Sequence, residues 1–163
     1  VGIFFPKDLG DAMAGRVRFL DESHSVIFTD KGIQFFSTRV ETSPELVSQI
    51  PIEENIRSIT YAQDKVGIVT DNVEGGDPYK LRIYDREGSP VFEKTFNYQY
   101  TGFDIDGDLV LLYNDSSCKV YNMTGTEKYN GTFDFTVSKV SAGRFPGTLL
   151  VMGPQKMTEI KLQ

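Results

Sequence analysis

The sequence is poor in the residues that most often build metal, redox and nucleophilic sites. It contains one cysteine, one histidine and no tryptophan in 163 residues. A lone cysteine, Cys118, excludes an intrachain disulfide. With His24 as the only histidine, a zinc site lacks its usual nitrogen and sulfur ligands. We therefore expect Cys118 to pack within a strand, and we assign no catalytic, cofactor-binding or metal-binding residue from the sequence.

Long apolar runs and an excess of positive charge are also missing. No run reaches the roughly 18 apolar residues that a membrane-spanning helix needs, and no signal peptide is recognisable, so we expect no direct membrane insertion by this segment. The 17 Lys and Arg residues against 23 Asp and Glu residues give a formal net charge of -6. This acidic balance disfavours nucleic acid and anionic lipid as partners. Because the chain begins at Val1 rather than Met, we interpret it as a processed chain or an excised fragment.

What the sequence does contain is a repeated β-hairpin. Residues 81–96 read LRIYDREGSPVFEKTF, and residues 119–133 read KVYNMTGTEKYNGTF. Tyr84 and Gly88 of the first stretch return as Tyr121 and Gly125 of the second, at the same spacing. Each copy predicts an alternating strand, a polar turn that contains glycine, and a second strand.

The repeat extends over most of the chain as a unit of about 40 residues, a period typical of a β-propeller blade. The second strand of each unit reads VIFTD, GIVTD, LLYND and LLVMG, starting at residues 26, 67, 111 and 149. Strands covered on both faces are expected to be continuously apolar, as these are. We therefore predict an all-β, propeller-like fold of about four blades, each a four-stranded antiparallel sheet. The predicted units of this single domain, residues 1–163, are 16–51, 55–96, 98–135 and 136–163.

The last unit is one strand short of a full blade, which leaves the architecture open between two arrangements. Val1–Phe5 could supply the missing outer strand and close a four-bladed ring. Alternatively, the chain is a fragment of a larger propeller, since propellers usually have four to eight blades. An open arc would expose two sheet faces and favour dimerisation or a partner.

The blade pattern resembles the WD40-like and quinoprotein-like propellers from Arg16 onward. Tyr84-Asp85 stands at the end of a third strand, where WD40 repeats place Trp-Asp. The equivalent positions of the other units, Phe36-Ser37, Tyr121-Asn122 and Ile160-Lys161, depart from that pair, so the resemblance is to a degenerate propeller. The repeats are also similar to propeller-type extracytoplasmic domains of uncharacterised single-pass membrane proteins of Gram-positive bacteria. That similarity implies a cell-surface location, and neither resemblance transfers catalytic residues.

Three alternating aspartates form the first candidate site. Asp104, Asp106 and Asp108 occur in FDIDGDL, and carboxylates at this spacing are reminiscent of a calcium loop. The glycine falls at position 107, however, and no glutamate closes a twelve-residue loop. We interpret the segment as a hairpin turn between a first and a second strand.

His24 is the second candidate, because histidine titrates near neutral pH and could act as a general base. It lies in the turn DESH beside Asp21 and Glu22. No nucleophile can be placed beside it from the sequence, so we expect an exposed turn residue.

The loop of residues 72–78, NVEGGDP, is an insertion relative to the other units. Loops on a rigid scaffold often carry binding sites, and Glu74 and Asp77 would suit a cation or a basic partner. A tolerated surface insertion explains the loop equally well. The N-x-S/T sequons at Asn114, Asn122 and Asn130 are expected from a turn-rich composition.

Two functions remain as hypotheses. The first is a non-enzymatic binding or scaffold module with a protein or saccharide partner, a homodimer being one arrangement. The alternative is a propeller enzyme, a hydrolase or lyase acting on carbohydrate in the central funnel. Carboxylates from different blades that converge within hydrogen-bond reach would favour the enzyme.

Overall fold

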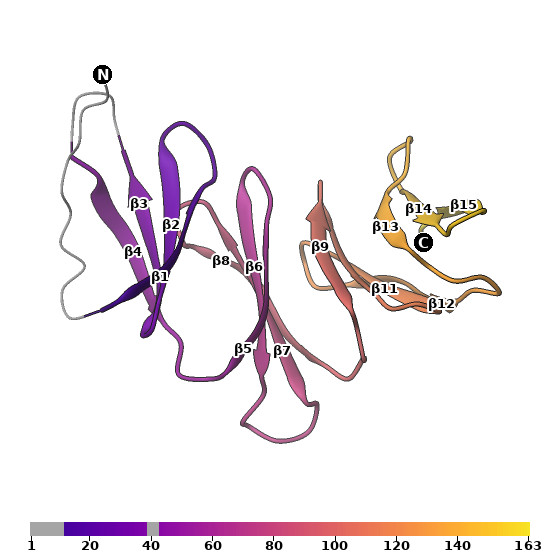
Figure 1. Ribbon diagram of the computed structural model, residues 1–163, viewed down its shortest axis with the longest axis horizontal. Coiled ribbons are helices and arrows are strands. Elements are labelled where there is room, and N and C mark those ends of the chain that lie inside the picture. Colours follow the sequence, from indigo (N-terminus) through magenta and orange to yellow (C-terminus); the bar gives the residue numbers. More distant parts are fainter. Residues whose placement is uncertain (1–11, 39–42) are drawn as a thin grey trace.

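The computed structural model describes residues 12–38 and 43–163, and this part of the chain is all β (Figure 1). It contains four antiparallel sheets and no helix, so the predicted fold class is confirmed and the chain is a propeller-like fragment. Accordingly, no helix of the described residues is long and apolar enough to cross a membrane.

Each sheet is built from strands that follow one another in the chain, so every neighbouring pair is a hairpin or a short connection. The first sheet contains β1 (Ala14–Phe19), β2 (His24–Thr29), β3 (Gly32–Ser37) and β4 (Glu45–Pro51). The second contains β5 (Ile56–Tyr61), β6 (Lys65–Asp71), β7 (Tyr79–Asp85) and β8 (Pro90–Phe96). The third contains β9 (Gly102–Asp106), β10 (Leu109–Tyr113), β11 (Ser117–Asn122) and β12 (Glu127–Thr132). The fourth has three strands, β13 (Lys139–Ala142), β14 (Thr148–Met152) and β15 (Met157–Lys161).

The repeated hairpin has a repeated turn chemistry. The Asp85 carboxylate accepts hydrogen bonds from the backbone amides of Glu87 and Ser89, and the Asn122 side-chain oxygen accepts the equivalent bonds from two amides of the next turn. Gly88 and Gly125 complete these turns with φ of 85° and 80°, which glycine adopts without steric cost. An Asx residue and a glycine therefore fix the same turn in two sheets.

The core lies between successive sheets rather than inside any one of them. One apolar cluster joins the first and second sheets, another the second and third, and another the third and fourth. The middle strands supply most of these side chains, as expected for strands that are covered on both faces. The first strands of the second, third and fourth sheets, β5, β9 and β13, contact one another in that order along the inner side of the series of sheets.

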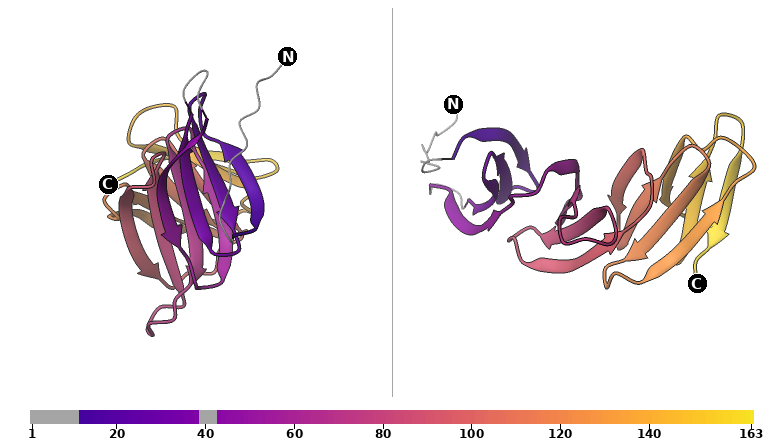
Figure 2. Two further views of the ribbon diagram at one scale, coloured as in Figure 1. Left: turned by 90° about the vertical axis from the view of Figure 1, so that its left-hand side faces the viewer. Right: turned by 90° about the horizontal axis from the view of Figure 1, so that it is seen from below.

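The four sheets form an open arc. The first and fourth sheets occupy opposite ends of the long axis (Figures 1 and 2). No apolar cluster of the described residues joins the first sheet to the fourth. Val1–Phe5, the strand expected to close a ring, falls outside the described residues.

Candidate functional site

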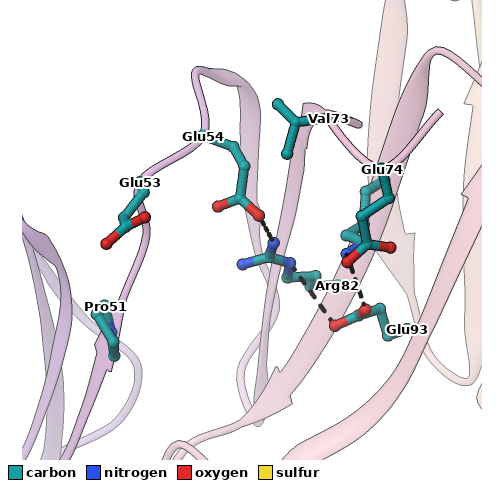
Figure 3. A pocket seen from close by; sticks show the side chains of 8 residues that line it. Pro51, Glu53, Glu54, Val73, Glu74, Arg82 and Glu93 are labelled. Atoms are coloured by element: carbon teal, nitrogen blue, oxygen red, sulfur yellow. Dashed lines mark hydrogen bonds and ion pairs between the residues drawn. The ribbon is translucent and has the colours of Figure 1, made fainter.

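A charged cavity of about 600 Å³ lies between the first and second sheets (Figure 3). It lies at the edge where the β4–β5 connection and the β6–β7 loop meet. The residues that line it are Pro51, Glu53, Glu54, Val73, Glu74, Lys80, Arg82 and Glu93. Two basic side chains thus share the cavity with four carboxylates.

The two basic residues come from β7 and point toward the first sheet. Lys80 and Arg82 are two positions apart, so they share one face of the strand. They are 7% and 8% exposed, which is rare for charged residues. Tyr84, two positions further on, packs in the cluster between the first and second sheets. The cavity therefore opens beside this apolar contact, at the point where the side chains on this face of β7 change from apolar to charged.

Carboxylates surround the two buried cations (Figure 3). Arg82 donates to Glu54 at 2.5 Å and lies 3.7 Å from Glu93. Lys80 is 3.3 Å from both Glu74 and Glu93. The Arg82 Nε atom is buried and makes no hydrogen bond in the described structure.

These ion pairs determine the protonation of the site. Burial disfavours the charged form of Glu54, but its own backbone amide and the Arg82 guanidinium outweigh burial and lower the pKa of Glu54. Burial likewise opposes the charge of Lys80, and the carboxylates of Glu93 and Glu74 outweigh it and raise the pKa of Lys80. Glu54 and Lys80 are therefore ionised at neutral pH.

The cavity carries more negative than positive charge. With four carboxylates against two cations, the surplus is two negative charges. The side chain of Val73 is 75% exposed and adds an apolar surface. Such a site attracts a cationic group and can contact the aliphatic stem that carries it.

The β6–β7 loop, residues 72–78, contributes to this cavity as the sequence suggested, but through only one of its two acids. Glu74 lines the cavity and pairs with Lys80. Asp77 instead accepts a hydrogen bond from the Thr95 hydroxyl at 3.0 Å. The side chain of Asn72 bonds to the carbonyls of Gly75 and Asp77 and so braces the loop internally.

The three alternating aspartates do not form a cation site. Asp104 accepts a hydrogen bond from Thr60 of β5, and Asp106 accepts one from the Ala142 amide of β13. Gly107 and Asp108 form the β9–β10 turn, which confirms the interpretation as a hairpin. Within the described ranges, no group of His, Cys, Asp or Glu is placed to hold a metal ion. Asp104 and Asp106 instead join the innermost strands of neighbouring sheets.

His24 is mostly buried, so the expectation of an exposed turn residue is wrong. Its side chain is 13% exposed, and its Nδ1 atom lies 2.9 Å from Asp21. Arg86, in the β7–β8 turn of the second sheet, reaches Asp21 at 3.0 Å. Hydrogen bonds from the Ser23 amide and from His24 lower the pKa of Asp21 well below its usual range. The group thus ties a turn of the first sheet to a turn of the second.

The other singled-out residues have structural positions. Cys118 is fully buried in β11, and burial raises the pKa of its thiol to about 12, so it stays protonated and unreactive. The side-chain oxygen of Asn114 accepts bonds from the Ser116 and Ser117 amides in the β10–β11 turn. The side-chain oxygen of Asn122 accepts the turn hydrogen bonds described above, and Asn130 is exposed on β12.

Sequence reasoning missed Lys80 and Arg82, although a signal was present. The sequence predicted an alternating strand in this stretch, and β7 is in fact covered on both faces. Charged residues at alternate positions of such a strand are unusual. The equivalent strand of the third sheet repeats the feature, since Lys119 of β11 is 17% exposed and pairs with Glu127. An alternating basic residue in a doubly covered strand therefore marks a paired, buried charge.

The fold belongs to the class of β-propellers, and this chain forms an arc of such a propeller. The family comparison is more specific: residues 1–162 match the family of unknown function DUF5711, and the chain belongs to this family. No protein of curated function matches the sequence.

The solved structures that resemble the chain are β-propeller proteins. Hsv2 of Kluyveromyces lactis matches with a TM-score of 0.52 at 10% identity, over 94% of this chain and 47% of Hsv2. BBS1N, solved in complex with ARL6DN, matches with a TM-score of 0.52 at 12% identity, over 97% of this chain and 55% of BBS1N. BamB of Moraxella catarrhalis matches with a TM-score of 0.48 at 10% identity, over 85% of this chain and 40% of BamB. The chain thus spans about half the length of the propellers it matches.

Proposed function

We propose that the chain is a non-enzymatic binding module and that the charged cavity between its first and second sheets binds a basic segment of a protein partner. The surplus of two negative charges in a cavity of about 600 Å³ carries this proposal. The overall charge of -6 adds a long-range attraction for basic partners.

The cavity offers two kinds of contact to a lysine or arginine side chain. Among the described residues, the Glu53 carboxylate makes no hydrogen bond or ion pair and can pair with the incoming charge. Lys80 and Arg82 instead hold Glu54, Glu74 and Glu93 in place. The exposed Val73 contacts the aliphatic stem. The lining lacks the aromatic side chains that a sugar ring would stack on, so a protein partner is favoured over a saccharide.

A hydrolase or lyase acting on carbohydrate finds less support. Such enzymes usually keep one carboxyl protonated near neutral pH to act as the acid. Here Arg82 helps to lower the pKa of Glu54, and the carboxylates that converge are already paired with cations. The cavity also lies beside the third and fourth strands of the second sheet rather than at the inner strands. An extracytoplasmic location, as part of a membrane-anchored protein, stays a prediction.

The test is the binding of a fluorescent hexalysine peptide at low ionic strength, measured by anisotropy, with hexaglutamate as the negative probe. Glu53→Gln is expected to weaken hexalysine binding by about two- to fivefold, as one exposed ion pair contributes up to about 1 kcal/mol. Asp108→Asn is the matched control, because it removes one exposed charge at the distant β9–β10 turn. Equal effects of the two substitutions, or no preference for hexalysine, would contradict the proposal.

A further inference from the structure

Lys80 of the charged cavity is held in the way that a bound cation would be held. Its ammonium lies 3.3 Å from both Glu74 and Glu93. The Lys80 side chain is 8% exposed, whereas the side chains of the two glutamates are 71% and 55% exposed. A lysine usually extends its charged end into water. Here the cation is buried, and its more exposed partners can turn toward a ligand.

The cavity offers two acidic positions to a basic segment. Glu53 comes from the β4–β5 connection and Glu74 from the β6–β7 loop, and Figure 3 shows them on opposite sides of the Arg82–Glu54 pair. Among the described residues, Glu53 makes no ion pair. Glu74 is already paired with Lys80. An incoming segment therefore meets one free carboxylate and one that holds a cation of the chain itself.

A lysine at this position is not a requirement of the sheet. Strand register makes Lys80 equivalent to Ser117 of the third sheet. Glu93 is likewise equivalent to Asn130. The Ser117 hydroxyl lies 2.8 Å from the Tyr98 hydroxyl, so a neutral hydrogen bond replaces the ion pairs there. The Lys80–Glu93 pair thus belongs to this cavity and not to the repeated strand pair.

Two buried polar atoms beside Lys80 make no hydrogen bond among the described residues, Arg82 Nε and Thr70 Oγ1. Thr70 is fully buried and lies opposite Lys80 in strand register. Ile68 packs against the first sheet, so Thr70, two positions on, faces the same way. The Arg82 side chain is 10% exposed and lines the cavity. Since buried polar groups are nearly always hydrogen-bonded, these atoms favour a site that a polar group from outside the chain completes.

We infer that Lys80 is an internal competitor for the ligand: its ammonium occupies the position between Glu74 and Glu93 that a basic side chain of the partner takes, and the bound partner displaces it. This inference rests on the proposed function of the cavity. Because the lysine stem is flexible, the displaced ammonium moves into solvent. The competition weakens the binding of a single cation. It therefore favours a segment with several neighbouring basic residues, of which one pairs with Glu53 and another replaces Lys80.

The first experiment repeats the hexalysine titration with Lys80→Met, which keeps an unbranched apolar side chain and removes the ammonium. The surplus of negative charge in the cavity then rises from two to three, four carboxylates against one cation. Hexalysine is expected to bind about fivefold more tightly than to the native chain, the contribution of one added ion pair. Lys80→Ser, which introduces the residue of the equivalent third-sheet position, should also bind more tightly and provides a second variant if Lys80→Met fails to fold.

Lys119→Met is the matched control for the change in net charge. Lys119 is also a largely buried lysine, 17% exposed, that pairs with a carboxylate, but it lies on the third sheet. Its replacement should change the affinity for hexalysine by less than about twofold, because distant charges are screened.

The second experiment measures whether the ligand exposes Lys80. The native chain is treated with an acetylating reagent, and mass spectrometry reports the modification of each lysine. The ligand is N-acetylated hexaarginine, which has no amine to consume the reagent. Lys80 should react slowly in the free chain and about threefold or more faster at saturating hexaarginine, whereas Lys119 should not change. A lysine with a purely structural role would instead react more slowly once a ligand covers the cavity.

The inference and the proposed function fail in different ways. If the native chain binds hexalysine through Glu53 but the two Lys80 variants bind it no more tightly than Lys119→Met does, the internal competition is wrong and the binding site stands. Slower acetylation of Lys80 in the presence of hexaarginine would have the same meaning. If neither the native chain nor Lys80→Met prefers hexalysine to hexaglutamate, the proposed function fails, and the inference fails with it.

Discussion

The face of the second sheet that packs on the first sheet and the corresponding face of the first sheet have equivalent residues in equivalent rows. The first sheet buries Gln34 and Phe36 on this face but leaves its first strand exposed. Ile68 and Val66 of the second sheet are fully buried against the first sheet. The equivalent edge of the first sheet leaves Val17 and Phe19 exposed. Since the strands and turns are alike, the difference arises from the neighbour and not from the sheet.

This comparison shows where a propeller blade gets its stability. A four-stranded sheet has two apolar faces and buries them only against other sheets. At the end of the arc, apolar side chains of a sheet that lack a neighbouring sheet stay exposed, and their exposure costs free energy of folding. It follows that substitutions at equivalent positions should differ in effect according to whether a neighbouring sheet is present.

The largest difference is expected between Ile68→Ala and Ile27→Ala. Ile68 is fully buried between two sheets, so its truncation should lower the free energy of unfolding by about 2–5 kcal/mol. The partly exposed Ile27 should lose about 1 kcal/mol, because less apolar area is involved. Urea denaturation of the two variants checks this contrast. Equal losses would show that the two faces are packed alike.

The next effect concerns the charges on the packed face. Glu54→Gln removes the closest partner of the buried Arg82 and should cost about 2 kcal/mol, less than a fully buried pair because Glu54 is 19% exposed. Replacing both residues, with Arg82→Met and Glu54→Leu, should restore much of that loss. Thermal unfolding of the single and double variants measures the coupling. A double variant as unstable as the sum of both singles would argue against a coupled pair.

A smaller effect is expected where the turn of one sheet contacts the next. A Cβ atom at Gly88 would lie 2.7 Å from the Phe35 ring, whereas one at Gly75 would meet nothing within 4 Å. Both glycines have positive φ, so each alanine carries a backbone penalty of about 1 kcal/mol. Gly88→Ala should cost about 1 kcal/mol more than Gly75→Ala because of the inter-sheet contact. Similar unfolding midpoints would mean that the β7–β8 turn can move away from the first sheet.

The smallest effect should be present at neutral pH and disappear in acid. The pKa of Asp21 is lowered in the folded state by the Ser23 amide and His24. A lowered folded-state pKa gives stability that is complete above the unfolded value of about 3.9 and is lost as the pH falls below it. Asp21→Asn should therefore be less stable than the native chain at pH 5–8 and equal to it in strong acid. A difference that persists unchanged at pH 2 would exclude Asp21 as its source.

Much of this fold could be predicted from the sequence because its elements are local. Alternating apolar residues, Asx residues and glycines determine the hairpins, and these signals recur in each unit. The last segment of the first unit is a strand, Glu45–Pro51, as the prediction of four strands per unit requires.

The fourth unit shows the limit of pattern matching. The sequence alignment of LLVMG with LLYND makes Leu149 equivalent to Leu111. In the structure, Leu111 lies on the face of the third sheet that packs on the following sheet, whereas Leu149 lies on the face of the fourth sheet that packs on the preceding one. A shift of one residue reverses the face of every side chain in a strand. Since Leu149, Leu150 and Val151 are all apolar, the sequence carried no polar marker of the true register.

The site was less predictable than the fold because it depends on how sheets stack. Glu74 was singled out as part of an inserted loop, but its partner Lys80 and the opposing Glu54 come from a strand and a connection that only packing brings together. Likewise, His24 is covered because the β7–β8 turn of the second sheet reaches its own turn. Polar contacts between two repeat units leave no pattern in the sequence of either unit, so they could not be predicted from it.

The measurement that tests the account most directly is thiol labelling at equivalent positions of the first and second sheets. Phe19→Cys and Tyr61→Cys occupy the same row position, and the native Cys118 is fully buried and serves as the internal reference. The account predicts fast labelling at position 19 and much slower labelling at position 61. Equal rates at the two positions would contradict the claim that a neighbouring sheet covers this position in the second sheet and leaves it exposed in the first.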